Sequence, residues 1–179
     1  YRNKHDITFS DETAAWGFDL PSLSNGAAYG DLDNDGDLDL VVNNVNMKSF
    51  LYENNANSLT DHNYIKLNFK GQEPNLFAIG TTVWMYYDDS VVMQELIPSR
   101  GFQSSIDYGM TIGLGNKTEV DSIRIVWPDD RTQLLTKVTS NQTLTLSQAD
   151  AAEKYIPVKE AEPAKILKEL PAPNLIAHV

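Results

Sequence analysis

The sequence contains no cysteine, few basic residues and no long apolar run. Without cysteine the chain can form neither disulfides nor thiolate metal sites, and this absence fits a reducing cytosol and a disulfide-poor periplasm equally well. No apolar segment approaches the roughly 18 residues that would indicate a transmembrane helix. The chain begins Tyr1-Arg2-Asn3-Lys4, with neither an initiator Met nor the apolar core of a signal peptide. We therefore interpret it as a fragment of a longer protein, with any export signal upstream.

Positive charge is scarce in this sequence. Lys and Arg number 14 against 25 Asp and Glu, which gives a formal net charge of −11. Nucleic-acid binding draws most of its affinity from basic patches that displace counterions from phosphates. The charge balance and the absence of any run of Lys or Arg therefore argue against a nucleic-acid partner.

Short runs rich in Val, Ile, Thr and aromatic residues recur about every ten residues between Gly, Asn and Asp, a pattern typical of all-β proteins. Helical periodicity is almost absent. In 64–69, for example, Ile65, Leu67 and Phe69 alternate with polar residues and should share one buried face. The sequence predicts nine strands, at 38–43, 49–53, 64–69, 81–87, 91–97, 111–114, 122–127, 133–138 and 143–146.

One acidic segment carries the clearest chemical signal. Residues 31–39 read Asp-Leu-Asp-Asn-Asp-Gly-Asp-Leu-Asp, a DxDxDGxxD pattern. Calcium prefers six to eight hard oxygen ligands, and alternate carboxylates on a tightly curled loop can supply them. We expect side-chain oxygens from Asp31, Asp33, Asp35 and Asp39. Asp37 stands where such loops usually present a backbone carbonyl, and we include it in the predicted metal site.

The surroundings of this segment determine which kind of calcium loop is expected. Gly36 permits a sharp turn that a Cβ would hinder. Five carboxylates within nine residues would repel one another without a cation, so we expect strain or disorder when calcium is absent. An EF-hand would need a bidentate Glu at the twelfth position, which is Val42, and flanking helices. The loop instead runs into a predicted strand, which excludes an EF-hand.

The first third of the chain resembles a known repeat. The residues that carry the likeness are Asn25-Gly26-Ala27-Ala28-Tyr29-Gly30-Asp31 and the following acidic loop, then Phe50-Leu51-Tyr52-Glu53-Asn54-Asn55, with a lead-in at 9–18. This segment is similar to an FG-GAP (VCBS) repeat, the blade unit of integrin-α-like β-propellers. The resemblance implies a partial propeller blade with a calcium loop over residues 1–58.

The middle of the chain resembles a second family. Its motifs are Ile79-Gly80-Thr81-Thr82-Val83, Arg100-Gly101-Phe102-Gln103-Ser104-Ser105, Ile112-Gly113-Leu114-Gly115 and the run from Val120 to Pro128. These residues are similar to the ASPIC/UnbV domain that follows FG-GAP repeats in secreted, cartilage-acidic-protein-like proteins. The resemblance implies an antiparallel β-sandwich or barrel-like domain over 59–148. Four of the eight prolines follow it, and 149–179 has the composition of a linker.

Catalytic arrangements find little support in the sequence. The histidines His5, His62 and His178 share no local motif with a Ser or Asp, although triads assemble in space. Acidic pairs such as Glu53 with Glu95 could be nominated for glycoside hydrolysis, but no pattern favours one. Five aromatic residues form either a sugar-stacking face or a β-core and its rim, namely Trp84, Tyr86, Tyr87, Phe102 and Tyr108.

These observations lead to one functional prediction and one alternative. We expect a calcium-binding recognition or adhesion module without catalytic activity of its own, which binds a protein or glycan outside the cell. The resemblance implies that the protein is secreted or faces the cell surface or periplasm. The alternative is an accessory glycan-binding domain of a larger polysaccharide-processing protein.

Overall fold

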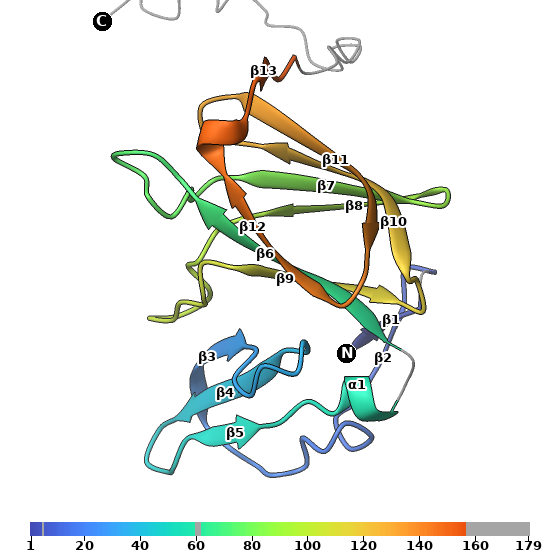
Figure 1. Cartoon of the computed structure of the whole chain (residues 1–179). Coiled ribbons are helices and arrows are strands. Elements are labelled where there is room, and N and C mark those ends of the chain that lie inside the picture. Colours follow the sequence, from blue (N-terminus) through green and yellow to red (C-terminus); the bar gives the residue numbers. More distant parts are fainter. Residues whose placement is uncertain (5, 60–61, 157–179) are drawn as a thin grey trace, which may run out of the picture.

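The computed structural model describes residues 1–4, 6–59 and 62–156 (Figure 1). Within these ranges the chain is built from strands, with one short helix, α1 (Ala56–Leu59), and a 3-10 turn at Gln148–Asp150. This confirms the predicted all-β fold. In the same ranges, no helix has the length and apolar character needed to cross a membrane.

Two open sheets make up the larger part of the molecule. The five-stranded sheet has the order β13 (Glu153–Lys154), β11 (Arg131–Thr139), β10 (Glu119–Val126), β7 (Thr82–Tyr87) and β8 (Ser90–Glu95). The three-stranded sheet has the order β12 (Gln142–Ser147), β6 (Asn63–Lys70) and β9 (Met110–Gly115). We call these two sheets together the β-domain.

A single hydrophobic core joins the two sheets of the β-domain. The alternation in β6 puts Ile65, Leu67 and Phe69 into this core, as the sequence predicts. Val83 and Ile125 enter it from the five-stranded sheet and are fully buried. Because strand side chains alternate between faces, the polar residues of β6 must point the other way, and this second face of β6 meets the acidic loop.

The pairing of β6 with β12 corrects the expectation of an antiparallel sandwich or barrel-like domain at one ladder. These two strands run parallel, with Gln142 opposite Ile65 and Ser147 opposite Lys70. The other ladders between named strands are antiparallel. A parallel pair cannot be closed by a tight turn and needs a long connection. Here that connection is the intervening chain, which forms β9 and four strands of the five-stranded sheet, β7, β8, β10 and β11, before it returns as β12.

The first third of the chain forms two small sheets. One pairs β1 (Arg2–Asn3) with β2 (Phe9–Ser10), and the other has the order β3 (Ser24–Gly30), β4 (Asp39–Asn44) and β5 (Phe50–Tyr52). Figure 1 shows the β3–β4–β5 sheet at one end of the β-domain, opposite the end where β13 lies. Every described buried hydrophobic residue of the core lies between Ile65 and Ala151, so this small sheet contributes none.

Each of the nine predicted strands is present, with ends that differ by a few residues. The sequence did not predict β3, whose Gly- and Asn-containing segment is extended because it pairs with β4. The predicted linker at 149–179 begins within packed structure, since Ala151 is buried and β13 pairs with β11. The remainder of that prediction, from residue 157 onward, lies outside the described residues.

Candidate metal centre and adjoining pocket

The acidic loop connects β3 to β4. Gly30 and Asp39 pair across these strands, so the ladder closes the loop at its base. The chain curls in between because Asn34 and Gly36 adopt positive φ angles of 63° and 95°, which Asn and Gly tolerate best. The curl turns alternate side chains toward one centre.

Three of the five predicted ligands meet in this loop. Asp31, Asp33 and Asp35 each place a carboxylate oxygen within 4.8 Å of the other two. Two of them are also fixed by short local hydrogen bonds, since the amide of Asp35 donates to Asp33 over 3.3 Å and the amide of Asp37 donates to Asp35 over 3.1 Å. Asp37 and Asp39 are not part of this group of three.

Asp31 is the most enclosed member of the trio. Its side chain is 5% exposed, and its Oδ2 forms an ion pair with Nζ of Lys66 in β6 at a distance of 2.8 Å. Its Oδ1 accepts a longer, 3.4 Å hydrogen bond from the amide of Gly36. The β-domain therefore supplies the counter-charge for one carboxylate of the loop.

Asp37 and Asp39 hold the loop by different means. Asp39 is 3% exposed, and its two carboxylate oxygens accept hydrogen bonds from the amides of Leu32 and Asn54 over 3.0 and 2.9 Å. Asp37 accepts a 3.3 Å hydrogen bond from the amide of Asn57 on Oδ2, whereas its buried Oδ1 has no hydrogen-bond partner. An unpaired buried carboxylate oxygen is costly unless a cation or water satisfies it.

Two asparagines around α1 complete the loop, and sequence reasoning did not single out either as functional. The side chain of Asn57 donates to the carbonyl of Asp35 over 3.1 Å, and that of Asn54 donates to the carbonyl of Leu38 over 3.2 Å. Asn54 lay within the motif that resembles the repeat, so its position carried a signal. Asn57 and Lys66 carried none, because their contacts depend on the folded arrangement.

The carboxylates of the loop differ in acidity. Burial, with the charges of Asp35, Asp39 and Asp33, raises the pKa of Asp37, although the Asn57 amide opposes the change. Desolvation and the charge of Asp35 likewise raise the pKa of Asp33. Burial would also raise the pKa of Asp31, but the hydrogen bonds from Lys66 and the Gly36 amide outweigh it and lower that pKa. Mutual repulsion therefore remains on the side of the loop that Lys66 does not reach.

The outward face of β6 contacts the loop at a second point. Gly36 is buried, and the ring of Tyr64 occupies the space that a Cβ at this residue would need. Tyr64 and Lys66 are two residues apart in β6 and so project from the same face. The β-domain thus fixes both the shape and the charge of the acidic loop.

This arrangement fits a divalent cation with hard oxygen ligands. Carboxylate and backbone oxygens on a flexible loop are what Ca²⁺ prefers, whereas softer metals favour thiolate or imidazole ligands. The unpartnered Oδ1 of Asp37 gives a further acceptor beside the trio. Asp31, Asp33 and Asp35 would hold the ion, with Asp37 and Asp39 at its border.

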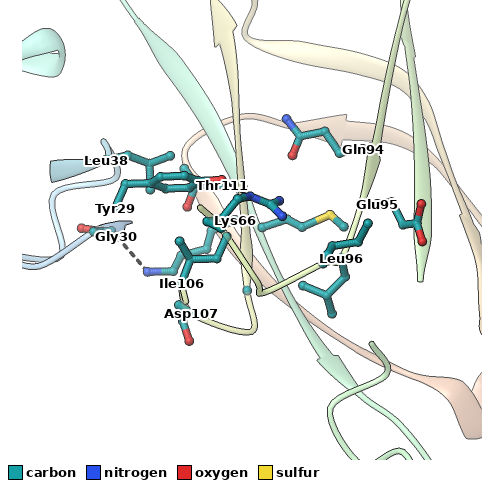
Figure 2. A pocket seen from close by; sticks show the side chains of 15 residues that line it. Tyr29, Gly30, Leu38, Lys66, Gln94, Glu95, Leu96, Ile106, Asp107 and Thr111 are labelled. Carbon is teal, nitrogen blue, oxygen red and sulfur yellow. Dashed lines mark hydrogen bonds and ion pairs between the residues drawn. The ribbon is translucent and has the colours of Figure 1, made fainter. Parts of the chain in front are cut away.

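A cavity of about 260 Å³ lies where β3 and the acidic loop meet the β-domain. Its walls include Tyr29 and Asp31 on one side, and Lys66, Arg100 and Thr111 on the other. Figure 2 shows Lys66 reaching across to form the ion pair with the loop, close to Tyr29 and Ile106. The cavity and the candidate metal centre therefore share the Asp31–Lys66 pair.

The other residues that the sequence raised as candidates do not converge on one site. Tyr87 packs against the core, and Tyr108 stacks on Phe77 with ring centroids 4.2 Å apart. Trp84 lies opposite Arg124 in the sheet register. Glu53, Glu95, Phe102 and His62 are exposed, while His5 and His178 lie outside the described residues.

The fold defines a two-sheet β-domain with an acidic loop docked on one end. Residues 71–153 match the family described as ASPIC and UnbV. The match covers just under half of the chain, from the residue after β6 to β13, and confirms that part of the predicted resemblance. It does not include the acidic loop. No curated protein matches the chain.

Proposed function

We propose that this chain is a calcium-stabilised recognition or adhesion module of the cell exterior or envelope, without catalytic activity of its own. Its partner is a protein or a glycan. Residues 1–58 act as an FG-GAP-type propeller blade segment, and the calcium ion holds the loop between β3 and β4. The observation that carries the proposal is the approach of Asp31, Asp33 and Asp35 to within 4.8 Å of one another.

The contacts around the trio support a structural role for calcium. The loop forms hydrogen bonds with Asn57 of α1 and an ion pair with Lys66 of β6, and its Gly36 packs against the ring of Tyr64. A cation that relieves repulsion among the carboxylates would therefore stabilise the loop and, with it, the contacts that the loop makes with Asn57 and Tyr64. Surfaces on both sides of the loop would then be presented to a partner in one fixed arrangement.

Thermal unfolding with calcium and with chelator tests the proposal. At a free calcium concentration about 100-fold above the dissociation constant, we expect a midpoint about 5–10 °C higher than in chelator. Asp33→Ala should abolish this difference. Asp89→Ala, which removes an exposed carboxylate from the turn between β7 and β8, should retain it. Equal midpoints for the unchanged protein with calcium and with chelator would refute a bound ion.

The alternative is an accessory glycan-binding domain of a larger polysaccharide-processing protein. The cavity beside the loop favours it, because Tyr29, Thr111 and Arg100 combine an aromatic ring with hydrogen-bonding groups, as sugar sites do. A glycan array probed with this chain, together with a hydrolysis assay on the full-length parent protein, separates the two functions. Hydrolysis by the parent of a glycan that this chain binds supports the alternative, whereas binding without hydrolysis supports a recognition module.

A further inference from the structure

Arg100 is the cation in the cavity whose charge is not compensated. Lys66, the other cation of the lining, is paired with Asp31 at 2.8 Å. Arg100 is partly buried, yet it takes part in none of the ion pairs among the described residues. In a chain with a net charge of −11, carboxylates are abundant, so a partly enclosed arginine without one marks a place for an external anion.

The guanidinium of Arg100 is held in position. Its Nε donates to the hydroxyl of Tyr29 over 3.1 Å, and its Nη1 donates to the carbonyl of Ser99 over 3.0 Å. Its Nη2 makes no hydrogen bond within the described part of the chain. A planar guanidinium fixed through two of its nitrogens offers the remaining donors without further loss of side-chain freedom. Such a fork matches the geometry of a carboxylate.

The rest of the cavity suits hydroxyl groups around a small ring. The side chains of Gln94 and Thr111 line it and form no hydrogen bond to another described residue, so both can donate to and accept from a ligand. In Figure 2 the carboxylates of Glu95 and Asp107 lie at two ends of the cavity and point away from Tyr29. They leave the centre free of an unpaired negative charge.

We propose that this cavity binds a hexuronate, a sugar ring that carries a carboxylate. The carboxylate lies on Arg100, the ring faces Tyr29, and the ring hydroxyls bond to Thr111 and Gln94. The volume of about 260 Å³ is just below the roughly 300–1,000 Å³ of pockets for drug-sized ligands, which suits a single sugar residue. An amino acid fits less well, because its ammonium group would find no free carboxylate at the centre.

This inference rests on the proposed recognition function and names the ligand class for it. The test is a titration of the whole chain, in calcium, with D-glucuronate while amide NMR signals are followed. We expect a dissociation constant on the order of 1 mM, as for a small polar ligand, with shifts at Gly30, Thr111 and their neighbours. D-glucose, which lacks the carboxylate, and acetate, which lacks the ring, should each bind at least about tenfold more weakly.

Substitutions of arginine give the matched comparison. Arg100→Gln should weaken glucuronate binding at least about tenfold, and Arg100→Lys should weaken it less, because the charge remains but the fork is lost. Arg124→Gln removes an exposed arginine of β10 that is outside the cavity and should leave binding unchanged. The amide spectrum of each variant without ligand reports whether that variant is folded. If Arg100→Gln does not fold, Arg100→Lys alone provides the comparison with the unchanged protein.

The outcomes separate this inference from the proposed function. Unchanged glucuronate affinity in both Arg100 variants, or equal affinity for glucuronate and acetate, would overturn the hexuronate site. The calcium-dependent rise in the unfolding midpoint, measured on the same samples, tests the proposed calcium site separately, because its result does not depend on whether glucuronate binds. A uronate trisaccharide that binds at least as tightly as the monosaccharide would assign the site to polysaccharide chains, whereas binding of the monosaccharide alone would assign it to free sugar acids.

Discussion

Lys66 supplies the positive charge that a nearly buried carboxylate of the acidic loop requires. Asp31 is 35 residues away in sequence and pairs with Lys66 over 2.8 Å. The same charge opposes a calcium ion placed beside Asp31, because like charges repel at short range. Lys66 therefore stabilises the loop without metal and would weaken the binding of the proposed calcium ion.

Lys66→Met should separate these two effects. Without calcium, loss of the partner of a nearly buried carboxylate should lower the free energy of unfolding by about 3 kcal/mol. With calcium, the variant should bind the ion more tightly than the unchanged protein. Denaturant unfolding and calcium titration measure the two quantities. Lys117→Met, which breaks the more exposed pair with Asp88, is the control and should alter both only slightly. Weaker calcium binding by Lys66→Met would contradict this assignment.

Asp37 should make the calcium-free protein sensitive to pH. Burial and the neighbouring carboxylates raise its folded pKa above the ordinary 3.8. Over the interval between these two pKa values the folded state binds more protons than the unfolded state. The contribution of Asp37 to stability therefore grows as the pH falls through that interval and declines as the pH rises. Asp31 behaves oppositely, since its lowered pKa gives stability that is lost as the pH falls below 3.8.

Carboxyl NMR titration and one isosteric variant check this prediction. In chelator, Asp37 should titrate above 3.8 and Asp31 below it. Asp37→Asn should raise the unfolding midpoint at neutral pH without calcium by about 2–4 °C, because a repelled charge is removed, and should weaken calcium binding. Asp89→Asn is the exposed control. A lower midpoint for Asp37→Asn in chelator would show that repulsion does not dominate at this residue.

Residue patterns predicted the core face of β6 but not what its other face meets. The alternation of Ile65, Leu67 and Phe69 follows from the two-residue period of a strand, and the structure confirms it. The same period places Tyr64 and Lys66 on the opposite face. Their partners in the acidic loop could not be deduced, because only the folded chain brings residues about 30 positions apart into contact.

At the scale of elements, the loop between β3 and β4 depends on one glycine for two reasons. Gly36 has a φ of 95°, and the Tyr64 ring fills the space where a Cβ would stand. Gly80 has nearly the same φ, 92°, but a Cβ added at this residue would have no other atom within 4 Å. A substitution at Gly80 would therefore introduce backbone strain alone, whereas one at Gly36 would add a steric clash with Tyr64.

Gly36→Ala and Gly80→Ala are expected to differ. Gly80→Ala should lower the free energy of unfolding by about 1–2 kcal/mol, the cost of a left-handed backbone for a residue with a Cβ. Gly36→Ala should cost clearly more and should weaken calcium binding, since the loop must move away from β6. Chemical denaturation and calcium titration of both variants provide the comparison. Equal losses would mean that the ring of Tyr64 moves aside freely.

The elements themselves were predicted with uneven success for physical reasons. Strands of the β-domain bury an apolar face and so carry a visible alternation. β3 buries little and contains Gly26 and Gly30, so its strand conformation comes from the ladder with β4 and not from its own composition. The parallel pairing of β6 with β12 was missed because strand periodicity says nothing about which strands become neighbours.

At the scale of the whole molecule, stability is unevenly distributed. The described hydrophobic core belongs to the β-domain, while the β3–β4–β5 sheet leaves residues such as Val41 and Leu51 37% and 69% exposed. A sheet without a core of its own opens more easily than one that has it. The contacts with β6, and the calcium ion if it binds as proposed, therefore determine how firmly the first third of the chain is held in its folded arrangement.

Hydrogen exchange on the intact chain should reveal this difference. In chelator, amides of β4 should exchange faster than amides of β6, β7 and β10. Calcium should slow exchange in β4 and the acidic loop by at least about tenfold and change β10 little, because ion binding stabilises the states that hold the ion. Uniform protection along the chain in chelator would show that the two parts open together.

The parallel partnership of β6 and β12 has a consequence for how the protein is made. During synthesis, β6 leaves the ribosome before β12 and cannot gain this neighbour until residues 142–147 have been translated. The apolar side of β6 therefore lacks this neighbouring strand until most of residues 71–153, the region that matches the ASPIC/UnbV family, has been synthesised. Pairing over such a sequence distance closes slowly, so the nascent chain would expose an incomplete sheet until its last long strand arrives.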